Sequence, residues 1–301
     1  MKQRRANRYL GGLISLAVLG CASTTATTAG PGTPSPEPRS PGPAPGGTPA
    51  PTRGGISYAP VRDAGYALER HDSLTIQLPG GATQQQLIDR TAYLRVSLVP
   101  DTTGYTATIT LDSVQAAVGG VPAAPDSVLP ARGTHWTGRL SPDGRLSALK
   151  ADRSTTIGDQ VGSTLRTLFP SLPSGGVAAG MSWTDTMDVP IRADAFDATE
   201  RSVTSYHATE SNDPRAKKAL KLESTGEYQR TGKGSQYDQQ MEMTASGSRR
   251  AVHYLNPDGT LAVAHGNDAG DLTITIPAVG QTVPVKQTGT FSITALRLIR
   301  R

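Results

Sequence analysis

The sequence predicts a mainly β fold, an antiparallel sheet with one or two short helices. Three observations support this fold class. Threonine, serine, glycine, valine and alanine are abundant, which favours strands and turns over helices. Apolar residues recur at every second position in several segments, and two turns of one hairpin type separate such segments.

The alternation of apolar and polar residues is clearest over 92–98 and 105–111, and it recurs over 272–276 and 291–295. Because successive side chains of a strand point to opposite faces, one face of such a sheet packs on a core and the other lies in water. Further strands are expected near 56–61, 74–78, 135–140, 145–149, 183–189, 198–208, 218–229, 236–245, 250–255 and 260–265.

Two turns share one form, Ser141-Pro142-Asp143-Gly144 and Asn256-Pro257-Asp258-Gly259. In each, proline presets the backbone at the second position and glycine takes the left-handed position at the end of the turn. The turns lie 115 residues apart, which suggests a duplicated unit with repeats over 56–150 and 180–301. Independent origin of the two turns is the alternative.

One helix is expected between these halves. Ile157, Val161, Leu165 and Leu168 recur at spacings of four, four and three, which places them on one helical face. Serine or threonine can cap the start of this helix, and a proline follows Leu168 at a short distance. A second short helix is expected over Thr83 to Asp89, so that the fold keeps at most two helices beside its sheet.

The N-terminus has the layout of a secretory signal peptide, which we expect to span 1–20, because a basic head precedes a mostly apolar run. This run ends in Gly20 and Cys21, and Cys21 is the only cysteine of the chain. A small residue followed by cysteine resembles the lipobox of bacterial lipoproteins. The resemblance implies cleavage after Gly20 and acyl chains on Cys21. A transmembrane anchor would need about 20 apolar residues, more than this run offers.

The segment 21–55 is expected to be a disordered tether, because it holds nine prolines and almost no bulky apolar residue. It would hold the β-rich domain, 56–301, away from a membrane in the cell envelope. Ala22 follows the cysteine. In bacteria with two membranes an aspartate there resembles an inner-membrane retention signal, so Ala22 predicts the outer membrane, facing either the periplasm or the surface.

The charge of the domain is balanced, since 56–301 holds 24 basic and 24 acidic residues. The excess of the whole chain, 30 Lys and Arg against 25 Asp and Glu, comes from its first 55 residues. Recognition of nucleic acid needs a clustered basic surface. The composition therefore excludes nucleic acid as a partner.

No motif predicts a catalytic or metal centre. The five histidines form no zinc spacing, and His253 and His265 are expected to be solvated strand residues. Gly232-Lys233-Gly234-Ser235 is expected to be a turn between polar strands. Asp185 and Asp188 would carry acid–base catalysis only if they shared a cleft. We therefore expect no enzymatic activity, no metal and no cofactor.

Two short runs together resemble a segment of β-rich bacterial lipoproteins. They are Phe169-Pro170-Ser171-Leu172-Pro173 and Gly180-Met181-Ser182-Trp183. The larger plan is similar to periplasmic lipoproteins of the LolA and LppX type. The resemblance implies that the antiparallel sheet is curved and half-barrel-like, with helices over its concave face and an apolar cavity for acyl chains. The residues that would line this cavity are Leu94, Val96, Ile109, Leu111, Val161, Leu165 and Leu168.

The leading hypothesis is thus a membrane-anchored lipoprotein that binds a lipid or other apolar molecule. The alternative is a structural or protein-interaction lipoprotein of the envelope, in which the same seven residues form a closed core. Cavity volume distinguishes the two hypotheses, because ligand pockets typically enclose some hundreds of Å³.

Overall fold

The computed structural model describes residues 55–59, 63–78, 80–193, 196–211, 220–236 and 239–296. The expected signal peptide, Gly20, Cys21 and all of the expected tether except Gly55 lie outside these residues. None of the helices in the described part is long and apolar enough to cross a membrane.

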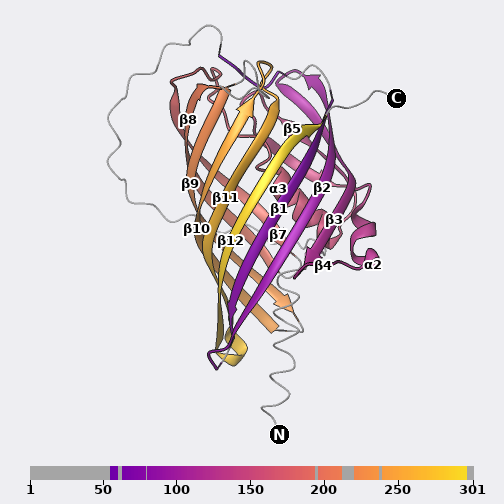
Figure 1. Cartoon of the computed structure of the whole chain (residues 1–301), viewed down its shortest axis with the longest axis vertical. Coiled ribbons are helices and arrows are strands. Elements are labelled where there is room, and N and C mark those ends of the chain that lie inside the picture. Colours follow the sequence, from indigo (N-terminus) through magenta and orange to yellow (C-terminus); the bar gives the residue numbers. More distant parts are fainter. Residues whose placement is uncertain are drawn as a thin grey trace, which may run out of the picture.

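A single antiparallel sheet forms the molecule, which confirms the predicted fold class (Figure 1). Its strand order is β6-β5-β3-β2-β1-β12-β11-β10-β9-β8-β7, with β4 paired to β3, and it is curled but not closed. The strands are β1 (Ala64–Gln77), β2 (Thr83–Asp101), β3 (Gly104–Val118), β4 (Val121–Pro122), β5 (His135–Leu140), β6 (Leu146–Ala151), β7 (Ser182–Ala193), β8 (Phe196–Glu210), β9 (Leu220–Gln236), β10 (Gln239–Leu255), β11 (Leu261–Ile276) and β12 (Gln281–Leu296). The helices are α2 (Pro125–Val128) and α3 (Thr156–Leu165), with short 3₁₀ turns at η1 (Leu129–Ala131) and η3 (Pro277–Val279).

The two faces of the sheet differ as the alternation predicts. Along β3, Ala107, Ile109 and Leu111 are buried on the concave face, and the threonines between them face outward. The outward positions of the long strands β8 to β12 are mostly threonine, serine, glutamine and charged residues. Water therefore solvates the outer face, while the concave face holds the core.

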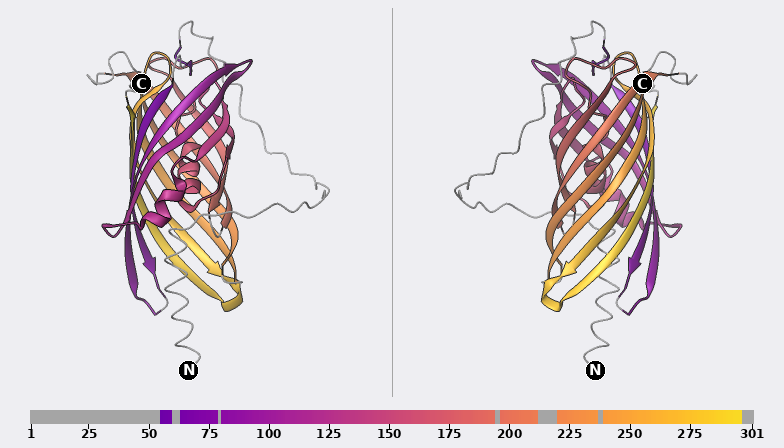
Figure 2. Two further views of the ribbon diagram at one scale, coloured as in Figure 1. Left: turned by 90° about the vertical axis from the view of Figure 1, so that its right-hand side faces the viewer. Right: turned by 90° about the vertical axis from the view of Figure 1, so that its left-hand side faces the viewer.

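One end of the curled sheet, the upper end in Figure 1, is filled by α3 and the segment that follows it. Thr155 caps α3, since its side chain accepts a hydrogen bond from the backbone N–H of Gly158. The buried face of the helix packs on strand residues from both walls of the sheet, and Figure 2 shows α3 between these walls. The predicted helix is confirmed, although it ends at Leu165, three residues before Leu168.

Both predicted hairpin turns are present at this upper end, with left-handed backbone at Gly144 and Gly259. A short segment joins them, because the N–H of Tyr58 donates to Pro142 O and the N–H of Ala59 donates to Asp258 O. The two segments considered as repeats, 56–150 and 180–301, both contribute strands to this one sheet. Their origin by duplication stays a prediction.

The sheet has two edges, β6 and β7, and side chains join them near the upper end. Arg145 Nη2 lies 2.5 Å from Asp185 Oδ1, which links the turn before β6 to β7. The indole N–H of Trp183 donates to Ser171 O, so the segment after α3 is fixed to the other edge. Pro190 lies further down β7, as expected of a strand at an edge.

The second predicted helix is wrong, because Thr83–Asp89 begins β2. As in a strand, Leu87 is exposed on one face and Ile88 is buried on the other. Each residue of this segment pairs with a residue of β1, and this pairing overrides the short apolar pattern. Of the strand expected over 56–61, the described residues 56–59 form one bridge, between Ile56 and Val177.

The strands are also longer than predicted. The expected turn at 232–235 lies within β9, which continues without a break to Gln236. The strands expected at 236–245 and 250–255 are one strand, β10, and those at 260–265 and 272–276 are both part of β11. Glycine and polar residues interrupt the apolar pattern in these places without ending the strands.

We predict that Gly162→Ala destabilises the fold although alanine is the better helix former by about 1 kcal/mol. A Cβ at Gly162 would lie 2.8 Å from Nε1 of the buried Trp136, so α3 would have to move off β5. Urea unfolding should show a lower free energy of unfolding. Thr164→Ala on the same helix is the control for propensity, and a gain in stability for Gly162→Ala would contradict this account.

Candidate functional site

The concave face has three zones, which can be followed down β1. Tyr66 and Leu68 belong to the upper core, Arg70 and Asp72 come next, and Leu74 and Ile76 belong to a lower apolar cluster. The same order recurs on β8 and β10. We call the middle zone the charge belt and define it by Arg70, Asp72, Arg90, Glu200, Arg230, Arg249 and Asp268.

The upper core contains all seven residues predicted to line an apolar cavity. They pack in one cluster with Tyr58, Tyr66 and Phe169, and each is at most 5% exposed. Neither of the two hollows described below includes any of them. The sheet and helix residues therefore lie together in this cluster, but they pack tightly on one another, as the closed-core alternative describes.

Asp72 and Asp268 form one half of the charge belt. Asp72 Oδ2 accepts hydrogen bonds from Arg70 Nε at 3.0 Å and from Arg90 Nη2 at 2.8 Å. Arg70 Nη2 also donates to both oxygens of Asp268, at 3.0 and 3.1 Å. Arg90 Nη1 donates to Gln160 Oε1 of α3 at 2.7 Å, which ties the helix to the belt. Asp72 Oδ1 lies 2.7 Å from Arg70 Nη2 but accepts no hydrogen bond, so this contact is a charge interaction alone.

Glu200 forms the other half with two arginines. Arg249 donates to both of its oxygens, at 2.5 and 2.9 Å, and Arg230 donates to Oε2 at 2.6 Å. The Arg249 guanidinium also lies 4.5 Å from the centre of the Tyr228 ring. Burial alone would raise the pKa of Glu200, but its hydrogen bonds and charge interactions with Arg249 and Arg230 hold that pKa below its ordinary value.

Cross-strand register joins the two halves of the belt. Arg249 of β10 lies directly opposite Asp268 of β11, and Gly289 of β12 lies opposite both Asp268 and Asp72. A Cβ at Gly289 would lie 2.7 Å from Asp72 Oδ1 and 3.0 Å from Asp268 Oδ1. The belt thus needs glycine at this point, because ionised side chains from both neighbours occupy the space above it.

The arginines cover the acids. The carboxylate side chains of Asp72, Asp268 and Glu200 are only 4–6% exposed, whereas the arginine side chains are 20–36% exposed. A molecule entering the concave space would therefore meet guanidinium groups before carboxylates.

Two apolar clusters lie below the belt. Phe196, Ala198, Met241, Met243 and Ile276 form one on β8, β10 and β11. Leu74, Ile76, Ile88, Val283 and Val285 form the other on β1, β2 and β12, and Leu272 packs against both clusters. Among the described residues no helix lies over this lower part of the concave face (Figure 2).

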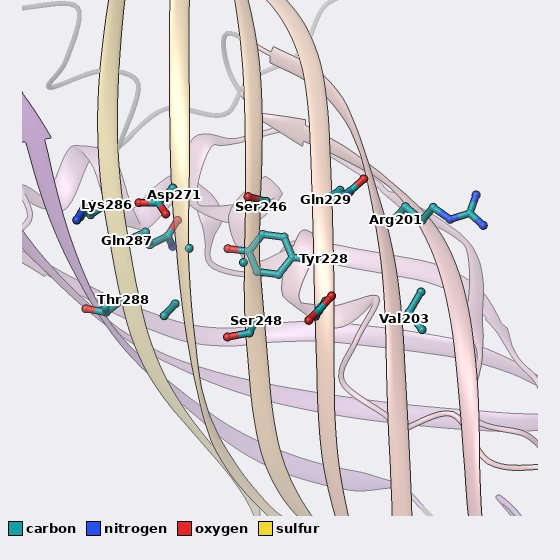
Figure 3. Close-up of a pocket in the computed structure, with 14 residues that line it drawn as sticks. Arg201, Val203, Tyr228, Gln229, Ser246, Ser248, Asp271, Lys286, Gln287 and Thr288 are labelled. Atoms are coloured by element: carbon teal, nitrogen blue, oxygen red, sulfur yellow. The ribbon is translucent and has the colours of Figure 1, made fainter.

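The outer face carries a separate polar hollow of about 730 Å³ across β8 to β12 (Figure 3). Arg201, Glu227, Asp271 and Lys286 bring charges of both signs to its lining, and small residues such as Ser246 form its centre. A second hollow of about 660 Å³ lies over the lower ends of β7 to β10.

The carboxylates considered for catalysis do not share a cleft. Asp185 faces the concave side and pairs with Arg145, while Asp188, three positions further along β7, is exposed on the outer side. Over the described ranges no three His, Cys, Asp or Glu side chains come together as metal ligands.

The expectation for His253 was wrong, since this histidine is buried on the concave face. A β-bulge lies next to Tyr254, and His253 pairs opposite the buried Ala264. Burial, with a smaller contribution from the charge of His265, lowers the pKa of His253 to about 4. Its Nδ1 has no hydrogen-bond partner in the described structure.

The charge belt was not predicted from the sequence. Its signal is the phase of the charged residues: Arg70 and Asp72 occupy the same alternate positions of β1 as the buried Tyr66, Leu68 and Leu74. When charged residues of one strand occupy the same alternate positions as its core residues, the pattern indicates a buried ion pair. The partners on β8 to β11 are too distant in sequence to be paired by such a pattern.

Comparison with known proteins adds no family. No protein-family model and no curated protein matches the chain. Among solved structures, DynF from the dynemicin biosynthesis pathway of Micromonospora chersina is 12% identical, with a TM-score of 0.24, over 82% of this chain and 92% of that chain. Neisserial surface protein A is 9% identical, with a TM-score of 0.22, over 76% of this chain and 96% of that chain. At such values neither likeness supports a functional argument.

We predict that His253 makes the fold sensitive to mild acid. Because its folded pKa is depressed to about 4 while the unfolded chain titrates near 6.5, stability is complete above pH 6.5 and falls as the pH drops toward 4. From neutral pH to pH 5 the loss from this group is about 2 kcal/mol. Urea unfolding at both pH values measures it.

His253→Leu should remove most of this difference between the two pH values, whereas His207→Leu on the exposed face should keep it. An equal pH dependence in His253→Leu and the unchanged chain would show that His253 is not the group responsible.

Proposed function

We propose that this chain is an exported lipoprotein, held to a membrane of the cell envelope by acyl chains on Cys21, which binds a lipid or other apolar molecule. The binding surface in this proposal is the lower half of the concave face, below the charge belt. It replaces the cavity between sheet and α3 that the sequence suggested, since the residues there pack closely on one another.

The observation that carries the binding proposal is the pair of apolar clusters on the lower concave face. Long strands extend them well beyond the part of the sheet that α3 and its following segment fill. Ile191, Leu272 and Ile274 remain partly exposed at these clusters. Burying such surface against an apolar ligand is favourable by about 25 cal/mol per Å².

The anchoring proposal is supported by the residues before the sheet. The apolar run that ends in Gly20 and Cys21 has the layout of a lipoprotein signal, and the proline-rich segment 21–55 is long enough to separate the sheet from a membrane. Ala22 favours the outer membrane in an organism that has two. The polar outer face of β8 to β12 suits a domain held in water beside that membrane.

A structural or protein-interaction role without a ligand is the second candidate. The outer hollow across β8 to β12 favours it, because its charges of both signs and its hydroxyl groups suit a polar protein surface. This role needs no apolar ligand on the concave face.

Native mass spectrometry of residues 56–301, exported behind a signal peptide without a lipidation cysteine, tests the binding proposal. We expect extra mass that solvent extraction removes and that matches a lipid. Ile274→Arg places a charge on the lower concave face and should lower the lipid-bound fraction about tenfold, since a buried unpaired charge is costly.

Thr275→Arg is the matched control, because the neighbouring side chain points to the outer face. Thermal melting verifies that both variants fold. A clean mass of the unbound protein, even after lipid is offered, would reject lipid binding and favour the second candidate.

The anchoring proposal predicts that Cys21→Ala leaves an unprocessed precursor without acyl chains, because the residue that signal peptidase and the acyl transfer require is absent. Intact mass and fractionation of cells measure processing and membrane release. Ser23→Ala is the control in the same segment. Processing and release identical to the unchanged chain would remove the lipoprotein assignment.

A further inference from the structure

The positive charge of the belt is not evenly distributed. In the half built on Asp72 and Asp268, two arginines face two carboxylates and the charges balance. In the half built on Glu200, Arg230 and Arg249 share one carboxylate. The excess of one positive charge therefore lies at the Glu200 end of the belt.

The exposed groups at this end are the arginines. The Glu200 side chain is 4% exposed, while those of Arg230 and Arg249 are 24% and 36% exposed. The pair thus has donors and charge beyond those that Glu200 uses.

The register of the sheet places an apolar surface directly beside this pair. Glu200, Arg230 and Ala245 lie opposite one another on β8, β9 and β10. One step down the concave face the corresponding residues are Ala198, Gly232 and Met243, followed by Phe196, Gly234 and Met241. Each step of two residues is about 7 Å along the strands. These residues of β8 and β10 are themselves buried. Leu272 and Ile274 of β11, which lie opposite Ala245 and Met243, are partly exposed, so accessible apolar surface begins beside the exposed guanidinium groups.

We infer that the ligand of the concave face is an amphipathic anion, whose carboxylate or phosphate head binds Arg230 and Arg249 while its chain lies against the partly exposed Leu272 and Ile274. This inference rests on the proposed function. Guanidinium groups bind planar carboxylates and phosphates through paired charge-assisted hydrogen bonds, and the low dielectric of a curled sheet strengthens such contacts.

The test compares lipids that differ only in their head. Residues 21–301 with Cys21→Ser, produced without the segment 1–20, are titrated by calorimetry with palmitate, hexadecanol, dipalmitoyl phosphatidate and dipalmitoylglycerol, each delivered from cyclodextrin. We expect each anionic lipid to bind about tenfold more tightly than its neutral counterpart. Preference for palmitate over phosphatidate, or the reverse, identifies a free fatty acid or a phospholipid as the source of the head group.

Variants then locate the head group. Arg249→Gln should abolish the preference for the anion and leave binding of hexadecanol unchanged, because Glu200 keeps Arg230 as its partner. Arg249→Lys should retain part of the preference. Arg250→Gln removes a neighbouring charge from the outer face and should change nothing. Melting temperatures verify that the variants fold.

Equal binding of anionic and neutral lipids, or a preference that persists in Arg249→Gln, would overturn this inference and leave the proposed function in place. Absence of binding for all four lipids would overturn both.

Discussion

Burial of three carboxylates on the concave face is the constraint on which much of this structure depends. An ionised carboxylate removed from water is costly unless it is paired. Asp72 and Glu200 each pair with two arginines, and Asp268 accepts at both oxygens from Arg70 Nη2. Except for Arg70 and Asp72, which share β1, these partners come from different strands. Slipping one strand by one residue would turn its charged residue outward and leave its partner unpaired, so the belt specifies the register across the middle of the sheet.

The open edges of the sheet set a second constraint. A curled sheet that does not close leaves β6 and β7 without a neighbour on one side, and unpaired edges can associate with other chains. Here α3 fills the upper space between the edges, and Arg145 with Asp185 joins them. The short segment at Tyr58 and Ala59 holds the two hairpin turns together by backbone hydrogen bonds. The upper end is thereby rigid, while the lower concave face is left to the apolar clusters.

Sequence patterns predicted the strands and turns that depend on residues close together in the chain. Alternation found β2, β3, β11 and β12, and proline and glycine found both hairpin turns. Strand length could not be predicted in the same way. Gly247 and its neighbours interrupt the apolar pattern of β10, yet the strand continues because its backbone pairs with β9 on one side and β11 on the other. The Tyr228 hydroxyl lies 2.6 Å from the place that a Cβ at Gly247 would take.

The candidate site was predicted less well, because its contacts are distant in sequence. Arg70 and Asp268 are separated by 198 residues, and nothing in either strand alone identifies the other as its partner. The seven residues expected around a cavity were correctly grouped, since apolar phase predicts which residues share a face. The phase of the apolar residues does not predict whether the space between sheet and helix is filled. That depends on α3 and the segment after it, whose depth in the sheet is a property of the whole fold.

The pairing of β1 with β12 has a consequence for the order in which the sheet forms during synthesis. The last strand to be synthesised lies in the interior of the sheet, between the first strand and β11. Strands β1 to β3 therefore cannot join β7 to β11 until the C-terminal residues have emerged, and contacts between such distant residues form slowly. Completion of the sheet is thus timed by the synthesis of β12.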